Sequence, residues 1–410
     1  MSEYVKITPK KLTGILSAPP SKSAAHRAIL CAALSSGKSK ILKLSYSEDI
    51  LATLSAVSVL GAKITATDDS AAVSGLCKGK ELDNIEIDCN ESGSTLRFII
   101  PIALAIGGSF SVTGKGRLME RPLDDYFKIF EKDGISYTKK GDTLYLSGKL
   151  QGGKYELAGD VSSQYITGLL FGLSMLSVDS EIFITTPLES APYVEMTIDI
   201  MSKFGIKIEK SPDLRQFIIK GGQQFTPTDY CVEGDYSQAA FYFVANTLGN
   251  DVYISGLSDS STQGDKEILE IIKQMSKPKD ERIIDVSQIP DLVPIITVLA
   301  TQTTGITHIV GAKRLRIKES DRLSAISTEL KKLGAKIEEK EDSLTVFGKT
   351  EFYGGEVDAH NDHRIAMSLA IASTVSKGEI KLTGYSSVRK SYPDFWEKFE
   401  ELGGKIEYVK

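Results

Sequence analysis

The chain is poor in the residues that mark metal-binding, disulfide-bonded and membrane proteins. Its 410 residues include four cysteines (Cys31, Cys77, Cys89 and Cys231), which lie far apart without a CxxC pair, and four histidines without metal-ligand spacing. We therefore expect reduced cysteines that are mostly packed in cores, a cytoplasmic location and no metal. No apolar run reaches about 18 residues, so we expect no membrane association. The first residues lack the basic and apolar regions of a signal peptide.

The sequence also lacks an excess of positive charge. Lys and Arg number 49 against 54 Asp and Glu, which gives a net charge of −5. A broad electrostatic surface for nucleic acid is therefore not expected, and any anion must be bound by local clusters of cations. The hydrophobic content of 41% is that of an ordinary globular protein. The length is sufficient for two or three domains.

A short motif recurs along the chain. The run Leu60–Ile64 (LGAKI) reappears at 333–337 and, as LGGKI, at 402–406, and weaker copies surround Gly134 and Gly205. The gap between Gly205 and Gly334 spans two periods, so we expect an eroded copy near residue 270. Six units of about 70 residues account for the chain, and such a repeat predicts a repeated architecture.

Each repeat has a readable pattern. A helix over 48–60 ends at Gly61 and is followed by short strands at 63–66 and 71–74. The next repeat predicts a strand at 85–88, a helix at 92–106, a strand at 109–113 and a helix at 123–132. The repeat is thus strand–helix–strand–helix–strand–strand.

Three repeats precede residue 225 and three follow it, which predicts two α/β domains. We expect one domain to contain residues 19–229 and the other to contain residues 1–18 plus 230–410, because the first repeat starts only near Ser21. Ligands favour such interfaces, so the active site is expected in the cleft between the domains. The two chain crossings would form a hinge for domain closure.

Polar and charged clusters recur where helices are predicted to start. In the first half, Ser21 or Ser23 can cap a helix that carries Lys22 and Arg27. Further sites of this kind are Glu91–Arg97 with its small Gly93, Gly114–Pro122 with three cations, Asp160–Gln164, and Ser190–Tyr193. A capped surface helix explains any one of these runs. Their recurrence favours anion binding at helix N-termini.

The second half adds carboxylates to the cations. Its clusters are Ile289–Asp291, Lys313–Arg322 with seven charges in ten residues, Asn361–Arg364, and Val388–Asp394. Salt-bridged surfaces are the alternative interpretation of each run. Taken together, the clusters suit two small phosphorylated or carboxylated substrates, with carboxylates available for proton transfer.

At these residues the chain resembles the 5-enolpyruvylshikimate-3-phosphate synthase family. The resemblance covers essentially the whole chain in the family's order: Ser21–Ser23 with Arg27, Gly93 with Arg97, Arg117–Pro122, Ser162–Gln164, Val232–Asp235, Gln263–Asp265, Asp291, Lys318–Arg322, Asn361–Arg364 and Lys390–Asp394. It implies two inside-out α/β domains, each made of three βαβαββ repeats, with one repeat eroded in the C-terminal half.

The resemblance also implies the reaction: the enolpyruvyl group of phosphoenolpyruvate is transferred to the 5-hydroxyl of shikimate 3-phosphate, and phosphate is released, without metal or organic cofactor. Asp291 matches the proton acceptor and Glu319 the proton donor, and Lys22 contacts both substrates. The residues implied for shikimate 3-phosphate are Lys22, Ser23, Arg27, Ser162, Ser163, Gln164, Ser190, Asp291 and Lys318. Those implied for phosphoenolpyruvate are Lys22, Gly93, Arg121, Gln164, Arg322, Arg364 and Lys390. We expect a monomer whose partners are these two small molecules.

Two alternatives stand beside this interpretation. One is the UDP-N-acetylglucosamine enolpyruvyl transferase family, which carries a Cys in the loop that matches 115–121 and a Lys-Asn pair where this chain has Lys22-Ser23. The other is a non-catalytic anion-binding protein, for which Asp291 and Glu319 would be useless. The chain departs from the family pattern at Glu91 and Arg314, where Asn is common, and in the shortened stretch 276–286.

Overall fold

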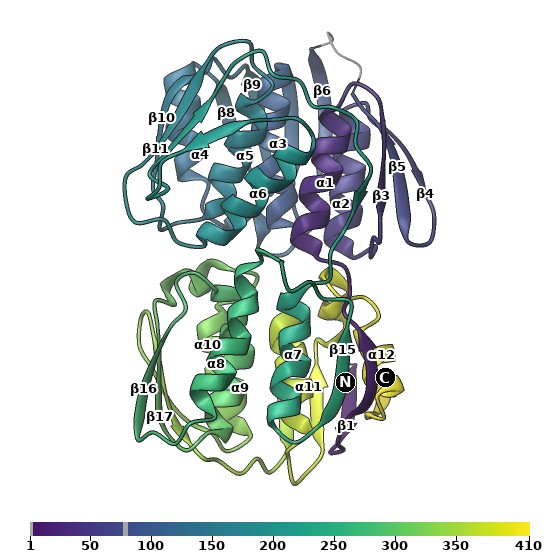
Figure 1. Cartoon of the computed structure of the whole chain (residues 1–410), viewed down its shortest axis with the longest axis vertical. Coiled ribbons are helices and arrows are strands. Elements are labelled where there is room, and N and C mark those ends of the chain that lie inside the picture. The colour runs from purple at the N-terminus through teal and green to yellow at the C-terminus, as the bar shows by residue number, and fades with distance from the viewer. Residues whose placement is uncertain (1–2, 77–80) are drawn as a thin grey trace. The chain divides into compact units, whose positions relative to one another are not determined.

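The computed structural model describes residues 3–76 and 81–410, so Cys77 lies outside the described residues. The chain divides into two compact units, which we call the central unit (Pro20–Glu233) and the terminal unit (Met1–Pro19 with Gly234–Lys410) (Figure 1). The second boundary lies slightly later than the one expected after residue 229. The reason is that strand β14 (Tyr230–Cys231) pairs with β3 (Lys38–Leu42) of the central unit.

The described strands form six sheets, and each four-stranded sheet pairs two parallel strands and adds two antiparallel strands. In three of these sheets a helix joins the two parallel strands and the last two strands form a hairpin. The first sheet of the central unit is β14-β3-β5-β4, with β4 at Lys63–Ala66 and β5 at Ser70–Ser74. The second is β6-β7-β9-β8, with its strands at Leu82–Asp88, Gly108–Thr113, Thr143–Gly148 and Ser136–Lys140. The third is β10-β11-β13-β12, with its strands at Gly153–Leu157, Ser180–Ile184, Gln216–Ile219 and Ile208–Lys210. The protein is therefore a mixed α/β protein of repeated βαβαββ-like units.

The terminal unit has two four-stranded sheets and one reduced sheet. They are β16-β17-β19-β18, at Glu281–Asp285, Gly305–Val310, Leu344–Gly348 and Lys336–Glu339; β20-β21-β1-β22, at Gly355–Asp358, Ile380–Thr383, Tyr4–Thr8 and Lys405–Val409; and β15-β2, at Asp251–Ser255 and Thr13–Ser17. Strand β1 lies between β21 and β22, so the two ends of the chain share one sheet. The reduced sheet is the eroded fourth repeat that the sequence predicts.

Helices form the interior of each unit. The first helix of each repeat is buried on nearly all sides; every residue of α1 from Ala24 to Leu34 is buried, as is every residue of α11. The central unit has α1 (Lys22–Leu34), α2 (Glu48–Val59), α3 (Gly93–Ile106), α4 (Asp124–Asp133), α5 (Ser163–Leu173), α6 (Ala191–Lys203) and the 3-10 helix η1 (Leu118–Glu120). The terminal unit has α7 (Tyr236–Thr247), α8 (Ile268–Met275), α9 (Val293–Gln302), α10 (Arg322–Lys332), α11 (His363–Ser373), α12 (Phe395–Glu401) and the 3-10 helices η2 (Gly264–Glu267), η3 (Pro290–Leu292), η4 (Lys313–Ile317) and η5 (Tyr385–Lys390).

The repeated glycines end helices, as their spacing predicts. The glycines at positions 61, 134, 205, 334 and 403 all have positive φ angles, between 69° and 112°. A side chain strains the backbone in this region, so glycine recurs where each helix turns into its hairpin. In the fourth repeat, α8 is followed by β16 without a hairpin, which explains why the motif is missing there.

Candidate active site

The run Pro19–Arg27 leads into α1, which begins at Lys22. Ser21 is the N-cap, and its hydroxyl accepts a hydrogen bond from the backbone N–H of Ala24 at 3.4 Å, so the cap is Ser21 rather than Ser23. Lys22 is the first helical residue, and its Nζ lies 2.5 Å from Oδ2 of Asp49 in the first turn of α2. Both side chains are mostly buried. This ion pair fixes an ammonium group at the N-terminal end of α1.

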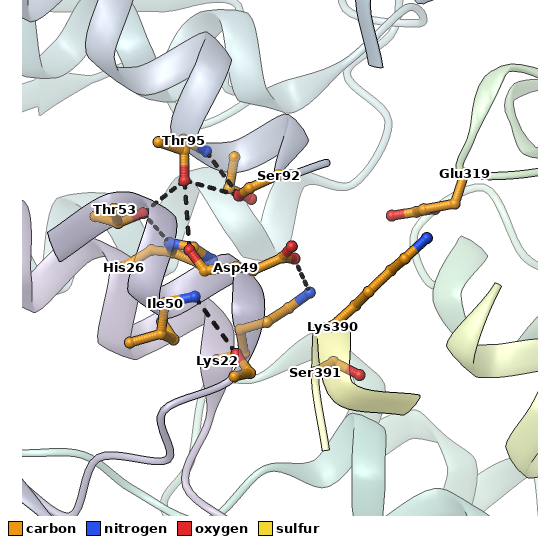
Figure 2. A network of polar contacts seen from close by, with 12 residues as sticks. Lys22, His26, Asp49, Ile50, Thr53, Ser92, Thr95, Glu319, Lys390 and Ser391 are labelled. Carbon is orange, nitrogen blue, oxygen red and sulfur yellow. Dashed lines mark hydrogen bonds and ion pairs between the residues drawn. The ribbon is translucent and has the colours of Figure 1, made fainter. Parts of the chain in front are cut away.

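A chain of buried hydroxyl groups lies behind this ion pair (Figure 2). Nδ1 of His26 contacts Oγ1 of Thr53 at 2.7 Å, which contacts Oγ1 of Thr95 at 2.7 Å, which in turn donates to Oγ of Ser92 at 2.7 Å. Burial and the nearby Lys22 cation hold the pKa of His26 well below its usual value, so the imidazole is neutral. These hydrogen bonds connect α1, α2 and the start of α3.

Gly93 begins α3 beside two guanidinium groups. A Cβ atom at this position would lie 2.5 Å from Nη1 of Arg121 and 3.0 Å from Nη1 of Arg97, so a side chain here would displace them. Nη1 of Arg97 donates to Oε1 of Gln164 at 3.3 Å, and Nε2 of Gln164 donates to Ser94 at 3.0 Å. Three segments therefore meet at one cationic site: the N-terminus of α3, the N-terminus of α5 and the loop that carries Arg121.

Arg27 is buried and held by neutral oxygens. Its guanidinium donates to Oγ1 of Thr197 at 2.7 Å and to the carbonyl groups of Ser23 at 2.7 Å and Tyr193 at 3.1 Å. Burial lowers the pKa of Arg27 to about 10, which still leaves it charged at neutral pH. The predicted hydroxyls lie at the adjoining helix starts: Ser162 caps α5, Ser163 is its first residue, and Ser190 precedes α6.

In the terminal unit, Asp291 is surrounded by three cations. Its Oδ1 lies 3.0 Å from Nη1 of Arg322 and 3.8 Å from Nζ of Lys318, and its Oδ2 lies 2.9 Å from Nη2 of Arg364. Burial opposes the ionisation of Asp291, but Arg364, Lys318 and Arg322 outweigh it and hold its pKa far below the usual value. Asp291 is therefore ionised in the free protein.

Arg322 is the centre of this cluster and is almost inaccessible to solvent. Besides Asp291, it contacts Glu319, with Nη2 2.6 Å from Oε2, and Asp362, with Nε 2.8 Å from Oδ2. Burial alone would lower the pKa of Arg322, yet these three carboxylates raise it. Asp362 is also the N-cap of α11 and accepts from the backbone N–H of Arg364 at 2.9 Å. One carboxylate thus positions both guanidiniums.

Two further residues belong to this cluster. The sequence assigns a role to Lys390 but none to Asp265. Nζ of Lys390 donates to the carbonyl of Asn361 at 2.6 Å, which joins η5 to the start of α11. The neighbouring Asp265 in η2 is buried, and burial together with the charge of Asp291 raises its pKa to about 6. Asp265, Asp49 and Asp362 received no role from the sequence, because an acidic residue near a helix start is ordinary capping.

The two departures from the family pattern have distinct surroundings. Arg314 is buried, and its Nη2 donates to the carbonyl of Ser287 at 2.7 Å. The carboxylate of Glu91 lies against the loop that follows β7, since a Cβ atom on Gly116 would be 2.7 Å from its Oε2. Glu91 thus packs against the basic loop that carries Arg121.

No metal centre or membrane helix is found in the part of the chain that the structure describes. Within residues 3–76 and 81–410, no group of three or more His, Cys, Asp or Glu side chains is arranged to hold a metal ion. Over the same residues, every helix is too short or too polar to span a bilayer. Of the described cysteines, Cys31 and Cys89 are buried, whereas Cys231 is exposed.

Fold and site together define a class of protein: a mixed α/β protein of six repeated βαβαββ-like units, with cations and carboxylates clustered at helix starts. The model of the EPSP synthase (3-phosphoshikimate 1-carboxyvinyltransferase) family matches residues 7–399. The chain belongs to this family.

Individual relatives agree with the family assignment. A 3-phosphoshikimate 1-carboxyvinyltransferase of Clostridium perfringens is 48% identical over 417 residues, covering 98% of both chains. One of Clostridium beijerinckii is 47% identical, covering 98% of this chain and 97% of its own. The solved structure of EPSP synthase from Acinetobacter baumannii is 25% identical with a TM-score of 0.80 over the full length of both chains. These relatives decide between the two enzyme hypotheses in favour of the first.

Proposed function

We propose that the two clusters described above carry out the reaction of this family within one active site. The activity is that of 3-phosphoshikimate 1-carboxyvinyltransferase, in the shikimate pathway and aromatic amino acid biosynthesis. The reaction transfers the enolpyruvyl group of phosphoenolpyruvate to the 5-hydroxyl of shikimate 3-phosphate and releases phosphate. The residue roles below are our assignment, and they are supported by the chemistry of each cluster.

Shikimate 3-phosphate is assigned mainly to the central unit. Its phosphate suits the start of α5, where Ser162 and Ser163 add hydroxyls to the positive end of the helix. Its carboxylate suits Arg27, whose guanidinium donates to three neutral acceptors. Ser23, Gln164, Ser190 and Lys22 complete the site from this unit, and Lys318 and Asp291 contribute from the other.

Phosphoenolpyruvate is assigned to groups from both units. Arg121, Gln164, Lys22 and the open backbone at Gly93 bind it from the central unit, and Arg322, Arg364 and Lys390 bind it from the terminal unit. Guanidinium groups suit the donor because they pair with phosphate and carboxylate through two parallel hydrogen bonds. Lys22 would contact both substrates.

Asp291 and Glu319 supply the proton transfers. In the addition step, Glu319 gives a proton to the methylene carbon of the donor while the 5-hydroxyl oxygen attacks its C2 and Asp291 accepts the hydroxyl proton. In the elimination step, the ionised Glu319 takes a proton back from the methyl group as the bond between C2 and the phosphate oxygen breaks. The proton held by Asp291 goes to the leaving phosphate, and the enol ether remains. When the donor binds to Arg322, Glu319 loses its partner guanidinium beside the negative charge of Asp291, which favours its protonated form.

The observation that carries these roles is the position of Arg322 between Glu319 and Asp291. Glu319→Gln keeps the shape but removes the transferable proton, so phosphate release should fall by about 10²–10⁴-fold. Asp291→Asn should behave similarly, with a larger loss of substrate affinity. Calorimetry should show shikimate 3-phosphate binding to Glu319→Gln almost unchanged. Glu338→Gln, an exposed carboxylate of β18, is the control. Near-normal turnover of both variants would disprove the catalytic roles.

Other features of this proposal remain predictions. They are two inside-out α/β domains of three repeats each, a monomer, a cytoplasmic location, and closure of the units on the substrates. Small-angle scattering with and without shikimate 3-phosphate tests closure, since an unchanged radius of gyration at saturation would contradict it.

A further inference from the structure

Glu329 is a carboxylate of α10 that the reaction outlined above does not use, and its side chain is fully buried. Two of its contacts are with the segment that precedes α11: Oε2 accepts from the backbone N–H of Asp358 at 2.9 Å, and Oε1 lies 2.8 Å from Nε2 of His360. Nζ of Lys332, on the same helix, lies 2.8 Å from Oε2. Burial opposes the ionisation of Glu329, but His360 and Lys332 outweigh it and lower its pKa. The carboxylate is therefore charged at neutral pH.

The segment that Glu329 contacts is a strained turn between β20 and α11. His360 and Asn361 have positive φ angles of 51° and 54°, and no other pair of neighbouring non-glycine residues does so in the part of the chain that the structure describes. A side chain is disfavoured in this region of φ, so the conformation persists only where the surroundings hold it. The backbone N–H of Asp362 closes the turn by donating to the carbonyl of Ala359 at 2.8 Å. Glu329 thus contacts the turn where support is needed.

The end of this turn contacts the three cations of the terminal unit that are assigned to phosphoenolpyruvate. Asp362 accepts from Nε of Arg322 at 2.8 Å and from the backbone N–H of Arg364 at 2.9 Å. The carbonyl of Asn361 accepts from Nζ of Lys390 at 2.6 Å. A change in the conformation of the turn would therefore move Arg322, Arg364 and Lys390 together.

Helix α10 holds this segment at two points on one face. Arg322 and Glu329 are seven residues apart, which is about two helical turns, so their side chains lie on the same side of the helix. Arg322 contacts Asp362 after the turn. Glu329 contacts Asp358 before the turn and His360 within it. One helix thus fixes the segment on both sides of its strained residues.

We propose that Glu329 is a positioning residue for phosphoenolpyruvate: together with His360, it fixes the left-handed turn on which the orientation of the three cations depends. This inference rests on the proposed function, which assigns those cations to phosphoenolpyruvate. Glu329 acts through the backbone of the turn and not on the substrate. Without its contact to His360 the turn relaxes toward the common φ range, and the cations leave the geometry that pairs with a phosphate and a carboxylate.

Two substitutions break the contact, one from each side. Glu329→Gln keeps the shape of the side chain but removes its charge. His360→Asn keeps a residue that tolerates positive φ but removes the imidazole, and the variant should fold because the His360 side chain is 39% exposed. Each variant should raise the KM for phosphoenolpyruvate about threefold to tenfold, as expected for the loss of one orienting hydrogen bond. The KM for shikimate 3-phosphate should change by less than about twofold. A merely structural defect would lower the apparent kcat through loss of folded enzyme but leave both KM values unchanged.

The double variant E329Q/H360N tests whether the two residues act as a unit. Because either substitution breaks the same contact, the KM for phosphoenolpyruvate should equal that of the more impaired single variant. Two effects that multiply would overturn the proposal. A second His–Glu contact of the terminal unit is the matched control: Nε2 of His308 in β17 lies 2.6 Å from Oε1 of Glu281 in β16. His308→Asn and Glu281→Gln should keep the wild-type KM values, and an equal rise in these variants would also contradict the proposal.

Arg364→Ala separates this inference from the proposed function. It should weaken the binding of phosphoenolpyruvate far more than that of shikimate 3-phosphate. If it has no such effect, the assignment of Arg364 in the proposed function fails. If it has that effect but E329Q and H360N keep the wild-type KM for phosphoenolpyruvate, only the role of Glu329 fails.

Discussion

Arg27 and Arg97 of the central unit have a different kind of partner from Arg322 and Arg364 of the terminal unit. Arg27 and Arg97 donate to carbonyl, hydroxyl and amide oxygens, and no ion pair forms at either one among the residues that the structure describes. Arg322 and Arg364 instead contact carboxylates. The two units share a repeated fold, so the difference lies in the side chains at the helix starts.

The difference predicts two modes of anion binding. A guanidinium with neutral acceptors keeps its positive potential, and an arriving anion adds a charge-assisted hydrogen bond without breaking an ion pair. A guanidinium that contacts carboxylates offers little net charge, so an anion must displace them or be accompanied by protons. Binding at the central unit should therefore be insensitive to the titration of protein groups near neutral pH, whereas binding at the terminal unit should be coupled to it.

Removal of Arg322 should have the largest effect on stability. Arg322→Met leaves Asp291, Glu319 and Asp362 without their shared cation, and breaking a buried ion pair costs about 3–5 kcal/mol. Trp396 is the only tryptophan and lies buried in the terminal unit, where its Nε1 donates to the carbonyl of Tyr385 at 3.0 Å. Urea unfolding followed by Trp396 fluorescence should detect this loss. A midpoint within error of the wild type would show that the carboxylates do not depend on Arg322.

Lys22 differs from Arg27 and Arg97 of the central unit, because its ammonium group contacts a carboxylate, that of Asp49. Lys22→Met should weaken both substrates by about 1.5–3 kcal/mol each, since one charge is removed from between two anions. Asp49→Asn frees the ammonium but loses its orientation, so it should weaken the substrates less. Calorimetric titration of each ligand checks both expectations. A stronger effect of Asp49→Asn than of Lys22→Met would reverse the assignment of roles.

Removal of Arg27 should have a smaller effect on stability than removal of Arg322. Arg27→Met loses three hydrogen bonds to neutral oxygens and a contact with the Phe98 ring, but it leaves no carboxylate unpaired. We expect a loss of about 1–3 kcal/mol in the central unit. Far-UV circular dichroism should detect it, while the transition that Trp396 reports should not move. Binding of shikimate 3-phosphate should fall, and an unchanged affinity would exclude Arg27 from that site.

Much of this architecture could be predicted from the sequence, because the repeat marks each helix end with a glycine that must adopt a positive φ. The helix starts were visible through Ser21, Ser162 and Asp291. The carboxylates that contact the cations could not be predicted from the sequence. Asp49, Asp265 and Asp362 resemble ordinary acidic residues near helix starts. Asp362 caps the helix that carries Arg364, and only the fold brings it to Arg322 as well. A contact across 40 residues between two helix starts leaves no local pattern.

The most direct test of this contrast between the two units is the pH dependence of the unfolding that Trp396 reports, in the wild type and in D265N. The pKa of Asp265 is raised to about 6 in the folded protein, mainly by burial, and is near 3.8 otherwise. The folded state therefore binds the proton more tightly, and stability is gained as the pH falls from about 8 to about 5 and is lost as it rises through 6. The wild type should gain about 1.4 kcal/mol more than D265N over this range, because the full effect of the shift in pKa is reached only below pH 3.8. Parallel curves for the two proteins would contradict the account.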